Sequence, residues 1–186
     1  FLHLSTHTDH REVCVQHLKG ACHRYELATK IEPAHKAYRN WGVVLSKLAR
    51  MTNDTSTTEK YFSQAEEKFA LSLEKTSSDS EVYFNWGNVH YHRARNDALQ
   101  KKSREAFQQL VYSGEKYMDA LKSGGGYNFD ALVNWGKVLN LQIHLSPDDH
   151  PPDYSLSLVV ELYLASFSSV VMGEDSGTSL SLKPIL

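Results

Sequence analysis

Cysteine is scarce in this chain, whose 186 residues include only Cys14 and Cys22. On the helix that we predict for this region, the eight-residue spacing separates the two thiols by about 12 Å along the axis, which is too far for a disulfide. Free thiols fit the cytoplasm or another reducing compartment. An organelle stays open too, because the chain begins at Phe1 without a methionine, and we expect its native N-terminus, with any targeting signal, to be missing.

The chain also lacks an excess of charge of either sign. Its 20 basic and 22 acidic residues give a net charge of −2, so we expect no nucleic-acid partner. A long hydrophobic run is absent as well: a membrane span needs about 20 apolar residues, whereas the most apolar stretch, 154–172, is shorter and contains Glu161. We expect no membrane span. A helix apolar all round is usually covered on several sides, so we predict self-association or a larger complex through 154–172.

No segment shows the alternation of a β-strand, and every long periodic segment has helical spacing. We therefore predict an all-α fold of about seven helices. The domain limits that we expect are an N-terminal segment without a clear period (1–10), a helical repeat domain (11–172) and a tail (173–186). The predicted helices are 10–31, 34–51, 58–76, 79–96, a fifth from near Leu99 to Gly124, 128–145 and 153–172.

The triplet Asn-Trp-Gly occurs three times, at 40–42, 85–87 and 134–136, and uses all three tryptophans of the chain. The surrounding spacings of three and four residues put each Trp and Gly on one helix stripe. A glycine inside a helix costs about 1 kcal/mol relative to alanine, so its recurrence indicates a compensating close approach of a neighbouring helix. A phosphate-binding glycine loop is the rival interpretation, but it needs a preceding strand, and no strand pattern precedes any triplet.

A second pattern, small–x3–aromatic–x2–small, alternates with the triplets. The unit is thus a helical hairpin, repeated at 45 residues between Trp41 and Trp86 and at 49 between Trp86 and Trp135. The second pattern is formed by Ala65, Phe69 and Ser72, by Ser113, Tyr117 and Ala120, and, before the first triplet, by Ala21, Tyr25 and Ala28 with Pro33 after them.

This series resembles the tetratricopeptide repeats over roughly residues 11–172. The resemblance implies an α-solenoid of helical hairpins in a right-handed superhelix, with a concave groove for a partner. The family's unit has about 34 residues, so each hairpin here carries extra residues, between Leu48 and Ala65 and between Ala94 and Ser113. We expect longer second helices or ordered loops there.

Stacked hairpins that bury the tryptophan stripe leave another face of each first helix to line the groove. Asparagine amides can bond the backbone of an extended peptide, and Arg and Lys can bind a carboxylate. We predict a non-catalytic interaction module or scaffold that holds a partner peptide there, without cofactor or metal. The candidate peptide-binding residues are Arg39, Asn40, Asn85, Asn88, His92, Asn134 and Lys137, and the same face carries Val43 and Lys47.

A competing interpretation is that these asparagines bridge helices within the scaffold. The resemblance also implies that Arg39, Asn85 and Lys137 stand at three of the five places where some family members clamp a C-terminal acidic peptide. Val43 and Val133 occupy the other two places and cannot bind a carboxylate, so we expect no full clamp.

Two alternatives from other classes remain. His10, Cys14 and His17 share one face of the first helix, which suggests a metal-binding or enzymatic subunit. Structural zinc sites usually draw ligands from two segments, so surface or interface histidines are the favoured interpretation. No serine lies in a Gly-x-Ser-x-Gly elbow, and we expect no catalysis. The other alternative is a structural subunit of a larger assembly, which contacts partners through its inserts and its apolar last helix.

Overall fold

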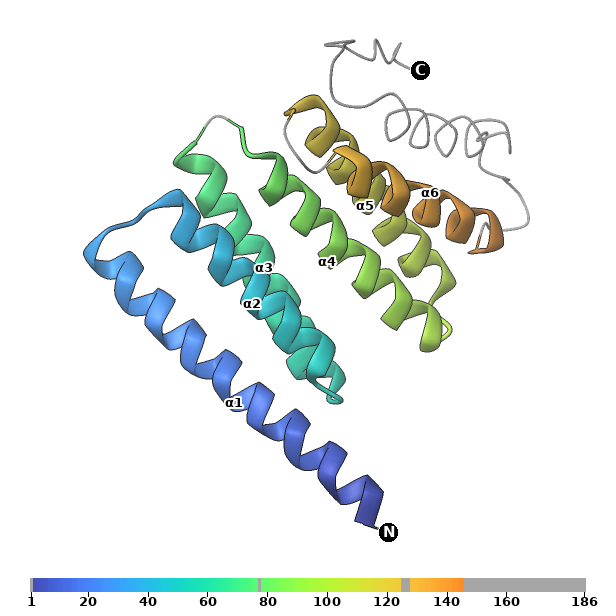
Figure 1. Ribbon diagram of the computed structural model, residues 1–186. Coiled ribbons are helices and arrows are strands. Elements are labelled where there is room, and N and C mark those ends of the chain that lie inside the picture. The colour runs from blue at the N-terminus through green and yellow to red at the C-terminus, as the bar shows by residue number, and fades with distance from the viewer. Residues whose placement is uncertain (1, 77, 125–127, 146–186) are drawn as a thin grey trace.

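The computed structural model describes residues 2–76, 78–124 and 128–145. Within these residues the chain is all-α, with six helices and no strand (Figure 1). None of these helices is both long enough and apolar enough to cross a bilayer. The predicted seventh helix at 153–172 and the tail at 173–186 lie outside the described residues. The six helices are α1 (Leu2–Ile31), α2 (His35–Met51), α3 (Thr55–Glu74), α4 (Ser80–Leu99), α5 (Ser103–Lys122) and α6 (Asn128–Leu145).

Each helix packs against the next one along the chain, as Figure 1 shows. The closest pairs are α2 with α3 and α4 with α5, each forming an antiparallel hairpin. The helix α1 packs on the first hairpin through α2, and α6 packs on the second through α5. The first helices of the two hairpins, α2 and α4, also touch, so their outward faces form one continuous surface.

Two helices start earlier than the sequence analysis predicts. We expected no period before residue 10, but α1 is helical from Leu2. The helix α3 begins at Thr55 rather than near Thr58, because the Asp54 side chain caps it by accepting a 2.7 Å hydrogen bond from the Thr57 backbone N–H. Thr58 is instead buried, and its hydroxyl donates a 3.5 Å hydrogen bond to the Ala49 carbonyl oxygen.

The boundary between the fourth and fifth helices is also shifted. The helix α4 continues to Leu99, Lys101 adopts a left-handed turn with φ of 60°, and α5 begins at Ser103. The extra residues of each unit therefore lengthen helices, since only 52–54 and 100–102 connect the helices of the two hairpins. The inserts thus form helix rather than ordered loops: the second helix begins well before its motif in both hairpins, and in the second hairpin the first helix, α4, is extended as well.

The glycines of the first two triplets are close-packing points. A Cβ atom built on Gly42 would lie 2.6 Å from the ring of Phe69, and one on Gly87 would lie 2.7 Å from the ring of Tyr117. Both rings are completely buried. The second helix of each hairpin thus lays its aromatic ring on the bare backbone of the first, which confirms the packing role predicted for these glycines.

The tryptophans pack toward the preceding helix of the array. Trp86 lies 6.3 Å from Phe69 between ring centroids, and Trp135 is within 3.2 Å of the Cβ position of Gly114. Trp135 is buried, but Trp41 and Trp86 are only half-buried, which is less than predicted. A lysine covers each of these two indoles, with Nζ 4.5 Å from the Trp41 ring for Lys68 and 4.7 Å from the Trp86 ring for Lys116.

Candidate peptide-binding groove

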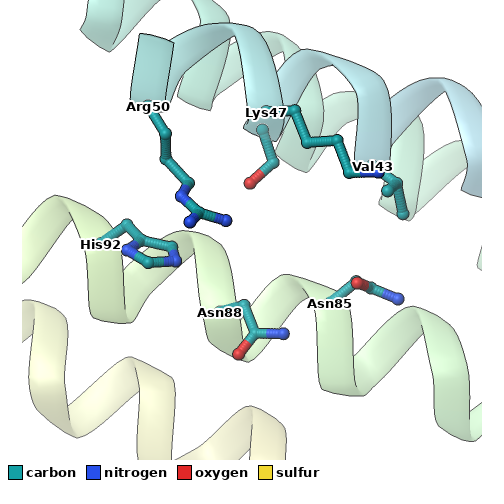
Figure 2. A pocket seen from close by; sticks show the side chains of 7 residues that line it. Val43, Lys47, Arg50, Asn85, Asn88 and His92 are labelled. Atoms are coloured by element: carbon teal, nitrogen blue, oxygen red, sulfur yellow. The ribbon is translucent and has the colours of Figure 1, made fainter.

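A groove runs between the outward faces of α2 and α4 and encloses about 200 Å³ (Figure 2). Helical periodicity explains its lining, because residues three and four apart share one face of each helix. The lining residues are Val43, Ser46, Lys47 and Arg50 from α2, and Asn85, Asn88 and His92 from α4.

The lining of this groove is positively charged. Lys47 and Arg50 are both exposed, and no aspartate or glutamate lines the groove. Neither cation is in an ion pair with any other residue that the structure describes. Two unpaired cations in a concavity attract an anionic group, and both side chains can donate charge-assisted hydrogen bonds to a carboxylate.

His92 is neutral at pH 7 in this groove. Burial, with a smaller contribution from the positive charges of Arg50 and Arg95, lowers its pKa from 6.5 to about 4. Figure 2 shows the guanidinium of Arg50 reaching from α2 toward the His92 ring. The ring therefore supplies one N–H donor and one acceptor nitrogen to the groove at neutral pH, and the positive charge there comes from Lys47 and Arg50.

The two asparagines of the groove are held by the scaffold. Asn85 donates from Nδ2 to the Glu81 carbonyl oxygen at 2.8 Å. The Oδ1 atom of Asn88 accepts from the Tyr117 hydroxyl at 2.7 Å and from Asn134 Nδ2 at 3.1 Å. This fixes the Asn88 amide, so that its Nδ2, for which no described residue is the acceptor, is left to donate to a ligand.

Arg39 does not line the groove. It forms ion pairs of 3.2 Å with Asp79 and 2.7 Å with Glu81, and its side chain is only 17% exposed. Asp79 is also the N-cap of α4, accepting from the Glu81 and Val82 backbone N–H groups. Arg39 therefore ties α2 to the start of α4, and the predicted role in peptide binding does not fit its position.

The remaining predicted residues also lie outside this lining. Asn134 donates to Asn88 across the α4–α6 junction, and Lys137 donates to Asn134 Oδ1 at 2.9 Å. The Asn134–Asn88 bond matches the competing interpretation, in which the amides bridge helices of the scaffold, whereas the Lys137–Asn134 bond lies within α6. Asn40 is half-buried on α2 and is not part of the lining.

Three of the seven predicted residues, Asn85, Asn88 and His92, thus come together in the groove. Ser46 and Arg50 line it too and were missed. Ser46 lies between Val43 and Lys47 on the same stripe, and Arg50 continues it toward the C-terminal end of α2, so the helical period of that stripe would have found both.

From His10 onward, the histidine-rich face of α1 shows no metal-binding geometry. Among the side chains that the structure describes (10–76, 78–124 and 129–145), no three His, Cys, Asp or Glu residues converge on a common point. His10 and His17 are exposed and Cys14 is half-buried. Comparison with known proteins adds no assignment, since no protein-family model, curated protein or solved structure matches this chain.

Proposed function

We propose that this chain is a non-catalytic interaction module, a tetratricopeptide-like solenoid with a right-handed superhelix, that binds an extended peptide of a partner protein along the α2–α4 groove. The observation that carries this proposal is the pair of exposed cations, Lys47 and Arg50, in a groove with no acidic lining residue. The peptide presents a carboxylate, from an acidic side chain or its C-terminus, to these two cations.

The polar groups beside the cations suit a peptide backbone. The Asn88 Nδ2 donor and the neutral His92 ring lie on α4, opposite the cations on α2 (Figure 2). An extended peptide has unpaired carbonyl and N–H groups along its length, and these need partners when the peptide enters a groove. A carboxylate on the α2 side and backbone bonds on the α4 side together fix the peptide's direction.

The test selects binders from a phage-displayed library of random peptides, using the full 186-residue chain as bait. We expect the selected peptides to carry Asp, Glu or a free C-terminal carboxylate. Titration calorimetry of one such synthetic peptide should show affinity falling about 100-fold for the double variant Lys47→Glu/Arg50→Glu, because two charge-assisted hydrogen bonds become repulsions.

The matched control is Lys60→Glu/Arg104→Glu, which makes the same change in net charge at exposed sites on α3 and α5. It should leave the affinity within about twofold, since these charges lie off the groove and are screened by salt. Equal losses in the two double variants would refute a groove site and point to non-specific charge attraction.

A further inference from the structure

The second helix of each described hairpin buries one stripe of five residues, spaced by four, three, four and three. None of these ten residues is more than 5% exposed. In α3 the stripe is Thr58, Phe62, Ala65, Phe69 and Ser72. In α5 it is Ala106, Leu110, Ser113, Tyr117 and Ala120.

The helix α1 carries a stripe with the same spacing and the same residue types. In contrast to the other two, none of its members is buried: Ala28 is exposed and the others are half-buried. Ile31, three residues further on, is 87% exposed. The α1 stripe is Cys14, Leu18, Ala21, Tyr25 and Ala28.

The packing on the other side of α1 fixes its register independently. Gly114, directly after the third stripe residue of α5, faces the Trp135 indole of α6. Cys22 holds the same place in α1 and packs with Trp41 of α2 around one core cluster, where burial raises the pKa of its thiol. The helix α1 therefore packs on α2 as α5 packs on α6. The α1 stripe therefore corresponds to the stripes of α3 and α5, each of which covers the first helix of its hairpin.

The contacts of the other two stripes define what fits on this face. Phe69 and Tyr117 each lie on a glycine whose Cβ would be within 2.7 Å of the ring, so the helix opposite Tyr25 needs a glycine at the contact point. Tyr117 also donates its hydroxyl to Asn88, the residue after that glycine. A Gly-Asn pair on the incoming helix would give Tyr25 the same two contacts.

We propose that the α1 stripe is a docking site for an amphipathic helix of a partner protein that places glycine opposite Tyr25 and asparagine directly after it. This site is separate from the α2–α4 groove and goes beyond the peptide binding proposed there. The incoming helix completes a hairpin in which α1 is the second helix.

The probe is a dye-labelled peptide of residues 78–102, which contains α4 with its Gly87-Asn88 pair, titrated with the full chain by fluorescence anisotropy. We expect saturable binding, weakened at least about tenfold by Gly87→Leu in the peptide, because a side chain there collides with the tyrosine ring. The chain variant Tyr25→Ala should weaken binding by a similar factor.

The control variant is His23→Ala, an exposed position equivalent to the exposed Glu67 of α3 and Glu115 of α5, and it should keep the affinity within about twofold. Circular dichroism checks that Tyr25→Ala is folded. If it is not, the Gly87→Leu peptide still tests the site on the unaltered chain. Absence of saturable binding, or binding that neither change weakens, would overturn the proposal.

Two further measurements separate this site from its competitors. Lys47→Glu/Arg50→Glu in the chain should leave the affinity for the α4 peptide unchanged, because the groove lies elsewhere; a parallel loss would overturn a separate site. Sedimentation of the chain alone tests for a second copy on the stripe. A dimer that Tyr25→Ala dissociates would overturn the assignment to a partner's helix.

Discussion

The ring of Tyr117 lies on Gly87, and its hydroxyl donates a 2.7 Å hydrogen bond to Oδ1 of Asn88, the next residue. One side chain of α5 therefore packs the hairpin and also orients a residue of the groove. Asn134 donates to the same oxygen from α6 at 3.1 Å. The Asn88 amide is thus held from two helices, and its Nδ2 keeps a fixed direction toward the groove.

We expect Tyr117→Phe to lower both stability and peptide affinity, because it keeps the ring on Gly87 but removes the hydroxyl. The free energy of unfolding should fall by about 1 kcal/mol, the net contribution of one buried hydrogen bond. Groove affinity should fall several-fold as the Asn88 amide loses one of its two restraints. Urea unfolding and calorimetry measure the two effects. Tyr112→Phe, at a 42% exposed position, is the control and should change neither.

Gly87→Ala should destabilise the chain although alanine is the better helix former. The gain in helix propensity is about 1 kcal/mol, but the new Cβ would be 2.7 Å from the Tyr117 ring, and overpacking costs about 1–3 kcal/mol. We expect a net loss of up to about 2 kcal/mol by urea unfolding. Gly20→Ala, with no atom within 4 Å of the new Cβ, should stabilise by about 0.5–1 kcal/mol. Stabilisation by both changes would contradict the packing role.

The role of these glycines could be predicted because it leaves a periodic trace in the sequence. Gly42 and Gly87 recur at one phase of a helix, and Phe69 and Tyr117 follow at matching positions. Helix ends were harder to place because they depend on local contacts: the Asp54 cap starts α3 ahead of its apolar stripe, and the left-handed Lys101 ends a helix without glycine.

The groove was only partly predictable, because polar residues on one helix face have several possible partners. The sequence predicts both Arg39 and Lys47 on the exposed side of α2. Folding, however, brings Asp79 and Glu81 of α4 next to Arg39. Asn134 likewise has a partner 46 residues away, Asn88. Spacing along one helix cannot show which polar side chains pair across helices and which stay available to a ligand.

The ion pair between Arg93 and Glu66 should contribute to holding α4 on α3. Their atoms Nη1 and Oε1 are 2.6 Å apart, and the side chains are only 11% and 24% exposed. We expect Arg93→Ala to lower the free energy of unfolding by about 2–3 kcal/mol, because it leaves a poorly solvated carboxylate. In a double-mutant cycle with Glu66→Gln, the coupling should be about 1–2 kcal/mol.

The control Glu59→Gln removes a partner of Arg93 that is 43% exposed and should cost at most about 0.5 kcal/mol. An equal cost for Glu59→Gln and Glu66→Gln would contradict the assignment.

Stability should fall as the pH drops from about 6.5 toward 4. Burial lowers the pKa of both His90 and His92 from 6.5 to about 4, so in this window the unfolded chain binds protons that the folded chain does not. Glu66, whose pKa is raised by burial, opposes the trend in part. We expect a loss of about 2 kcal/mol or more between pH 7 and pH 5 in urea unfolding. The double variant His90→Gln/His92→Gln should lose much less over the same range; an unchanged slope would assign the effect to other groups.

Peptide binding should be coupled to protonation of His92. In the free chain, burial and the charges of Arg50 and Arg95 keep the pKa of His92 at about 4. A bound carboxylate brings negative charge to the same groove and raises that pKa. The complex therefore takes up a proton at a pH where the free chain does not, so affinity increases on acidification as long as the carboxylate stays ionised.

For an acidic peptide from the library we expect a gain of about three- to tenfold between pH 7 and pH 5. In His92→Gln this gain should disappear, while Lys47 and Arg50 still provide binding at pH 7. The same gain in His92→Gln would place the coupled proton elsewhere, and a loss of affinity on acidification in the unaltered chain would show that no anionic group binds beside His92.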